Sequence, residues 1–223
     1  MVLIVERAQE TDIQRLLDIM YAAFSKDPWD RIMYPHIPAP EARGASIERW
    51  RDEISIDPTM HFMKVVDTDI GEIIALARWN VYEVERPESE WKSTKPRNWD
   101  IGANVEAANE FYNAVCESRQ NFMGGKPHCR LNMLVCDPQH QRRGAGRMLL
   151  HWGLNRADNL VLEAYLEASS EGHHLYQSAG FEDVGTLDID MTKYGGHGIH
   201  QHFVMTRAAQ KPHSPKSASG SIP

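Results

Sequence analysis

The stretch LVCDPQHQRRGAGRMLL, residues 134–150, joins a predicted strand to a predicted helix through a turn that contains two glycines. The apolar run 131–136 predicts the strand, and the spacing of apolar residues over 148–154 predicts the helix. Gly144 and Gly146 lie in the turn, where the lack of a Cβ lets a ligand approach the backbone. The first N–H groups of a helix have no intrahelical partner and carry partial positive charge. The stretch therefore predicts a site for a phosphate-bearing ligand at the start of the helix.

Three arginines, Arg142, Arg143 and Arg147, add formal positive charge to this turn. The turn fits neither of the two commonest phosphate-binding motifs. It lacks the Lys-Ser/Thr pair that ends a P-loop. Leu149 stands where the third glycine of a dinucleotide-binding GxGxxG motif would be. The predicted phosphate site is therefore of another kind.

The turn resembles motif A of the GCN5-related N-acetyltransferases (GNAT), whose pattern is Gln/Arg-x-x-Gly-x-Gly/Ala. Gln141, Gly144 and Gly146 occupy its fixed positions. The block LEAYLEASSEGHHLYQSAGFEDVG, residues 162–185, resembles motif B of the same family, in which a strand is followed by a helix that carries Leu-Tyr and ends at Gly-Phe. The combination of LEAS, LY and GF is similar to the fungal branch of the superfamily. The resemblance covers residues 131–203 well and the N-terminal half loosely.

This resemblance implies an α/β fold with a central mixed, mostly antiparallel sheet of about six to seven strands. Helices would cover both faces, and the two central strands would splay apart. It also implies acetyl-CoA as co-substrate, no metal, and transfer of the acetyl group to an amine by direct attack. Expected cofactor contacts lie on the strand end, the turn and the second motif: Leu134, Val135, Cys136, Gln141, Arg142, Arg143, Gly144, Ala145, Gly146, Arg147, Ser169 and Tyr176. Ser169 departs from the family, because many relatives carry an asparagine there.

Two residues are expected to carry the chemistry. Tyr176 matches the tyrosine that acts as general acid near the coenzyme sulfur in this family, and a phenol can donate a proton to a thiolate. Its alternative role is that of a core aromatic residue on an amphipathic helix. Glu167 follows the predicted strand 161–166 and is expected to act as the base. Its alternatives are a solvated carboxylate and a partner of a helix N-cap.

The acceptor pocket is expected in the N-terminal half, because aromatic loops often line small-molecule sites. Packing in the core is the alternative for the aromatic residues concerned. The candidates are Trp29, Tyr34, His36 and, on a preceding strand, Trp79. His200 and His202 would share one face of a strand, but no third ligand on another element is evident, so no metal site is expected.

Periodicity and turn residues predict the remaining elements. A single domain is expected over residues 1–207, and a disordered tail rich in Ser and Pro over 208–223. Thr11 or Asp12 is expected to cap the first helix. The predicted elements are strands at 2–5, 61–67, 70–79 and 161–166, helices at 13–24, 46–53 and 104–122, and a surface loop at 83–100.

Composition limits the classes of function. A net charge of −7 argues against a nucleic-acid partner, and no apolar run is long enough for a membrane span. Three cysteines without metal-ligand spacing favour a reducing, cytoplasmic setting. The expected partner is a small-molecule amine, and the expected state is a monomer or homodimer. Acetylation of protein N-termini or lysines is the alternative activity, and a non-catalytic acyl-CoA-binding module is the alternative class.

Overall fold

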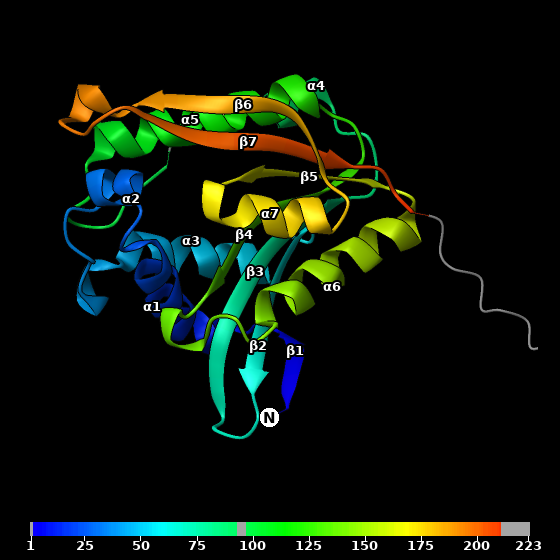
Figure 1. The fold of residues 1–223 in the computed structure, drawn as a ribbon, viewed down its shortest axis with the longest axis horizontal. Coiled ribbons are helices and arrows are strands. Elements are labelled where there is room, and N and C mark those ends of the chain that lie inside the picture. Colours follow the sequence, from blue (N-terminus) through cyan, green and yellow to red (C-terminus); the bar gives the residue numbers. More distant parts are fainter. Residues whose placement is uncertain (1, 93–96, 211–223) are drawn as a thin grey trace, which may run out of the picture.

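In the computed structural model, residues 2–92 and 97–210 are described, and they form a seven-stranded sheet with the order β1-β2-β3-β4-β5-β7-β6 (Figure 1). Strands β4 and β5 pair in parallel, and the other neighbouring strands in this sheet are antiparallel. The predicted mixed, mostly antiparallel sheet is therefore confirmed. The strands are β1 (Leu3–Arg7), β2 (Met60–Asp67), β3 (Glu72–Tyr82), β4 (His128–Cys136), β5 (Glu163–Ala168), β6 (Glu182–Asp190) and β7 (Ile199–Arg207).

Helices cover both faces of this sheet, as expected. Helices α6 and α7 lie on one face, and α1, α3 and α5 lie on the other (Figure 1). The helices are α1 (Ile13–Phe24), α2 (Pro28–Met33), α3 (Gly44–Ser55), α4 (Glu88–Trp91), α5 (Val105–Phe122), α6 (Ala145–Leu160) and α7 (Ser170–Ser178). Short 3₁₀ helices lie at Glu10–Asp12, Pro40–Ala42, Pro138–His140 and Met191–Tyr194. No helix in the described ranges is long and apolar enough to cross a membrane.

Three of the local predictions need correction. The Asp12 carboxylate accepts a hydrogen bond from the Gln9 N–H (2.8 Å) instead of capping α1, because it closes the preceding 3₁₀ turn. The strand predicted at 161–166 begins at Glu163, because Val161 ends α6 in the left-handed region with a φ of 55°. The predicted surface loop at 83–100 contains α4, and its residues 93–96 lie outside the described residues.

The expected boundary between domain and tail lies close to the end of the described residues. Residues 211–223 of the expected tail lie outside the described residues. Residues 208–210 follow β7, and the Gln210 N–H donates a hydrogen bond of 2.7 Å to the Asp158 carboxylate on α6. This part of the chain is therefore held against the domain.

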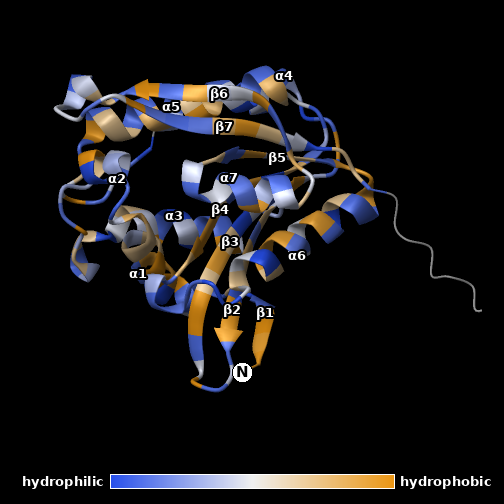
Figure 2. Ribbon diagram, in the orientation of Figure 1, coloured by the Kyte–Doolittle hydropathy of each residue, from blue (hydrophilic) through white to orange (hydrophobic). Residues whose placement is uncertain are grey.

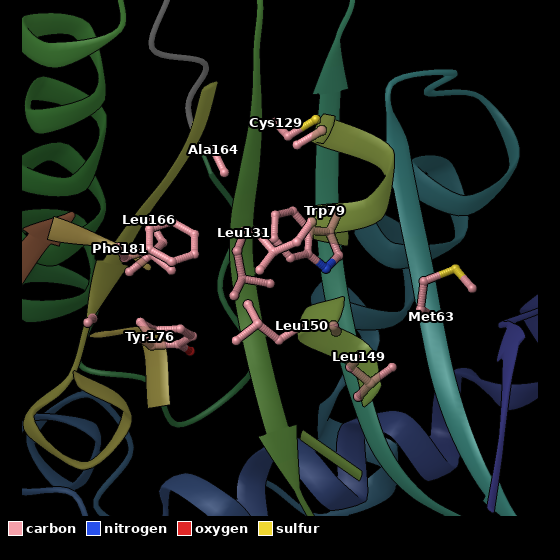
Figure 3. Close-up of a cluster of buried hydrophobic side chains, with 14 of the residues drawn as sticks. Met63, Trp79, Cys129, Leu131, Leu149, Leu150, Ala164, Leu166, Tyr176 and Phe181 are labelled. Atoms are coloured by element: carbon pink, nitrogen blue, oxygen red, sulfur yellow. The ribbon is translucent and has the colours of Figure 1, made fainter. Parts of the chain in front are cut away.

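Apolar packing differs between the two faces of the sheet. On the α6 and α7 face, one cluster of buried side chains runs from β2 across to β7 (Figure 3). On the other face the described residues form two clusters, one beneath α1 and α3 and one beside α2 and α5. Figure 2 shows the corresponding hydrophobic residues along β1, β2 and β3. The division between the two clusters falls between β4 and β5.

The central strands part after a short ladder. β4 and β5 pair at four positions, from His128 with Glu163 to Leu131 with Leu166. Beyond that point β4 pairs with β3, and β5 pairs with β7. Asn132 is an extra residue in the β3–β4 ladder, where the register shifts opposite Arg78. A bulge bends a strand and increases its twist, so it accounts for the divergence of β4. The splay expected from the resemblance is confirmed.

Candidate active site

The glycine turn presents an open helix N-terminus beside the end of β4. Gly144 caps α6 in the left-handed region with a φ of 89°, and a Cβ placed on it would meet nothing within 4 Å. A side chain there would therefore extend into the space in front of the first helical N–H groups. Arg142 also has a positive φ, 63°. An open helix N-terminus is a favourable place for an anion.

Gly146 serves a different purpose from Gly144. A Cβ placed on Gly146 would lie 3.3 Å from Leu134 Cδ2 and 3.5 Å from Cys136 Sγ. The first turn of α6 therefore packs closely on β4, and this contact fixes the helix N-terminus next to the diverging strand. Leu134 and Cys136 direct their side chains toward α6, whereas Val135 is buried in the cluster beneath α1.

The three arginines of the turn have different surroundings. Arg143 forms an ion pair with the buried Asp67 at the end of β2 and lies 2.9 Å from His140 Nδ1. The hydrogen bond from Arg143 lowers the pKa of the Asp67 carboxyl. Arg142 and Arg147 are exposed, and neither forms an ion pair with a described residue. Arg143 therefore fixes the turn, whereas the charges of Arg142 and Arg147 face solvent.

Tyr176 lies on α7 with its side chain between β5 and β4, and its hydroxyl points toward β4 (Figure 3). The residue is 8 % exposed, and its ring makes a T-shaped contact with Phe181 at 6.1 Å. Burial raises the pKa of the phenol above its usual value, and the nearby Cys136 thiol adds to this. The phenol therefore keeps its proton at neutral pH. Ser169 caps α7, and its Oγ accepts a 3.4 Å hydrogen bond from the Gly172 N–H.

Glu167 lies on β5 one residue beyond the β4–β5 ladder. Its side chain is 6 % exposed. The carboxylate accepts hydrogen bonds from the Tyr165 hydroxyl (2.9 Å) and from the Arg130 guanidinium (3.2 Å). The Tyr165 hydroxyl also lies 3.0 Å from Ser118 Oγ. Glu167 is thus neither a solvated carboxylate nor an N-cap partner, but a buried carboxylate held in a fixed orientation.

Further buried arginines lie near Arg130, and none of them was expected from the sequence. Arg78 on β3 pairs with Glu53 of α3 at 2.5 Å, and it is almost as buried as Arg130 on β4. Arg97 lies beside Arg49 and Arg78; burial and these two charges lower its pKa to about 10. The available signal was a charged residue inside an otherwise apolar strand, as in IIALARWNV around Arg78.

The expected acceptor residues divide into two groups. Tyr34 and His36 line a cavity of about 360 Å³ at the C-terminal end of α1. Trp29 and Trp79 are fully buried in separate clusters. A Cβ on Gly153 would lie 2.1 Å from Trp79 Cε2, so the Trp79 ring is packed beneath α6. Neither tryptophan can reach a ligand unless the core repacks, so both belong to the core-packing alternative.

Two histidines of β7 lie close to Trp29. The rings of His200 and His202 are 4.7 Å apart, and the His200 ring stacks on Trp29 at 6.0 Å. Burial, with a contribution from His200, lowers the pKa of His202 to about 4. The His202 ring is therefore neutral at physiological pH, and burial lowers the pKa of His200 as well. The part of the chain that the structure describes contains no group of three or more His, Cys, Asp or Glu side chains suited to a metal ion.

Comparison with known proteins gives the family. The family model for the acetyltransferase (GNAT) domain matches residues 103–183. An acetyltransferase of Stachybotrys chartarum is 31% identical over 81 residues, which are 36% of this chain and 34% of that protein. The probable acyltransferase SID5 of Ajellomyces capsulatus is 31% identical over 106 residues, which are 47% of this chain and 72% of that protein. Both organisms are fungi. The chain belongs to the GNAT superfamily of acetyltransferases.

Solved structures share the fold at low sequence identity. The C-terminal condensation domain of Ebony, in complex with beta-alanyl-dopamine, has a TM-score of 0.68 at 15% identity, covering 93% of this chain and 99% of that chain. The mosquito arylalkylamine N-acetyltransferase like 5b has a TM-score of 0.62 at 11% identity, covering 93% and 100%. PaiA N-acetyltransferase of Thermoplasma acidophilum, in complex with coenzyme A, has a TM-score of 0.53 at 13% identity, covering 93% and 99%. The fold and the family expected from the resemblance are confirmed.

We predict that Gly144→Val abolishes coenzyme A binding, because a β-branched side chain would occupy the space in front of the α6 N-terminus. The left-handed φ also makes any side chain strained, by about 1–3 kcal/mol. Gly102→Val is the matched control, because Gly102 has a φ of 90°, an equally open Cβ position and no place in the turn. Calorimetric titration with coenzyme A measures both variants. Wild-type affinity in a folded Gly144→Val protein would contradict the assignment of the turn.

Proposed function

We propose that this protein transfers the acetyl group of acetyl-CoA to a primary amine of a small molecule. The observation that supports this best is the parting of β4 and β5. The open α6 N-terminus lies against β4 on one face of the sheet, and Tyr34 of the cavity packs against the clusters of the other face. A thioester placed between the strands would be reached by coenzyme A from one face and by an amine from the other.

The co-substrate fits the residues on the coenzyme side. The backbone amides of residues 142–147 would hold the pyrophosphate, and Arg142 and Arg147 would offset its charge. The edge of β4 from Asn132 to Cys136 no longer pairs with β5, so its N–H and C=O groups can meet the amides of the pantetheine arm as an added strand would. An N–H at Leu134 or Val135 could donate to the thioester carbonyl as that oxygen gains charge.

Two side chains would move the protons. When bound, acetyl-CoA supplies a thioester whose carbonyl carbon the amine nitrogen attacks, so that a C–N bond forms and the C–S bond breaks. Glu167 would receive the proton that the amine loses, directly or through water. Arg130 and Tyr165 hold its carboxylate in place. Tyr176, with its phenol kept protonated by burial, would donate a proton to the departing sulfur.

A small acceptor agrees with the size of the cavity and with the fold relatives. The cavity of about 360 Å³ lies within the range of small-molecule sites. One relative of the same fold is an arylalkylamine N-acetyltransferase, and another holds beta-alanyl-dopamine. The size of the cavity therefore supports a small amine as the acceptor.

The test of this function is the release of free thiol from acetyl-CoA in the presence of a panel of small amines and lysine-bearing or N-terminal peptides. We expect turnover with small amines. Turnover with peptides alone would contradict the proposal in favour of protein acetylation. Coenzyme A binding without turnover on any acceptor would contradict it in favour of a binding module.

We also predict that Tyr176→Phe lowers kcat by about 10²-fold and leaves the KM for acetyl-CoA nearly unchanged. Phenylalanine keeps the packing against Phe181 and loses only the hydroxyl, and general acid catalysis contributes about 10²–10⁴-fold. Tyr82→Phe on β3 is the control, and its kcat should equal that of the wild type. Full kcat in Tyr176→Phe would make Tyr176 a packing residue.

A further inference from the structure

The cavity at the end of α1 contains a carboxylate that the proposed reaction does not use. Asp30 lies on α2 and lines this cavity with the aromatic rings of Phe24, Tyr21 and Tyr34. Tyr34 packs against the cluster that holds Val135 of β4 and also against the cluster that holds residues of β5 and β7. A wall of the cavity therefore contacts both sides of the splay, and the cavity adjoins the place where an acceptor must bind.

The Asp30 carboxylate has no partner in the part of the chain that the structure describes. The Asp30 N–H donates to the Asp27 carboxylate at 3.0 Å, but the Asp30 side chain accepts no hydrogen bond and forms no ion pair. Burial and the nearby charge of Asp27 raise the pKa of Asp30. The next residue, Arg31, is exposed at the rim of the cavity and does not pair with it. Asp30 is partly exposed to the cavity, so an unpaired carboxylate there would attract a cation that enters it.

Aromatic side chains complete the surroundings of this carboxylate. Tyr21 and Tyr34 form a T-shaped pair at 5.4 Å. The Tyr21 hydroxyl donates to Asp100, and the Arg43 guanidinium lies over the Tyr21 ring. These two contacts hold Tyr21 in place, whereas Tyr34 and Phe24 are partly exposed along the cavity. Aromatic faces attract organic cations and also pack against apolar bodies.

We propose that this cavity binds an organic ammonium group with Asp30 as its counter-ion, and that it selects acceptors that carry an aromatic or alkyl body next to that ammonium. This inference rests on the proposed function and adds a specificity residue to it. Asp30 recognises the acceptor in the charged form that prevails in solution, whereas proton removal belongs to Glu167.

The test is calorimetric binding without acetyl-CoA, with tyramine and with 4-propylphenol, in which a methyl group replaces the ammonium. We expect the wild type to bind tyramine roughly tenfold or more tightly than 4-propylphenol, since hydrogen bonds to charged groups are stronger than those between neutral groups. Asp30→Asn should lose this preference. Glu48→Gln is the control, because it removes one negative charge at an exposed position of α3. This variant should keep the preference for tyramine. Asp30→Asn should melt no lower than the wild type, because Asp30 loses no partner.

Several results would overturn the inference. These are undetectable tyramine binding by the wild type, equal affinity of the wild type for both probes, or an unchanged preference in Asp30→Asn. If Asp30→Asn does not fold, the inference is tested on the wild type alone. Its preference for tyramine should then decrease at high salt, and a preference that does not change with salt would overturn the inference. Asp30-dependent tyramine binding without acetylation of any small amine would support the inference and contradict the proposed function. Acetylation of tyramine with an unchanged KM in Asp30→Asn would support the proposed function and contradict the inference about Asp30.

Discussion

The early end of the β4–β5 ladder is the constraint on which the rest of this structure depends. Two central strands pair at four positions and then diverge, which leaves backbone donors and acceptors of β4 without a strand partner. Such groups are costly to leave unsatisfied in a protein interior, so this edge is suited to an extended ligand. The apolar packing follows the same division. One cluster beneath α6 and α7 holds the sheet together across the gap, and the opposite face divides into two clusters.

Charged side chains lie where that opposite face divides. The ion pair of Arg130 with Glu167 joins β4 and β5 where their ladder ends, and Arg78, paired with Glu53, lies near Arg130. Buried ion pairs contribute little net stability, so packing alone does not account for them. In the proposed reaction, Arg130 would orient the Glu167 carboxylate that receives the proton of the amine.

Local patterns made the coenzyme side of the site predictable. Glycine turns, helix caps and hydrophobic periodicity act over a few residues, so the strand, turn and helix of residues 131–150 and the left-handed Gly180 after α7 could be predicted from the sequence. The acceptor side depends on contacts between distant residues. Arg130 and Glu167 are 37 positions apart, and the burial of Trp79 beneath Gly153 is set by the approach of α6. Aromatic content alone could not distinguish Tyr34, on a cavity wall, from Trp29, in the core.

Amide hydrogen exchange over residues 132–136 tests the central claim most directly. If the pantetheine arm of coenzyme A adds to the unpaired edge of β4, binding of acetyl-CoA should slow exchange at alternate amides along this segment. The amides that already pair with β3 should stay protected in both states. Slowing that is confined to the first turn of α6, with no change at residues 132–136, would show that coenzyme A binds the glycine turn without entering the splay, and would contradict this account.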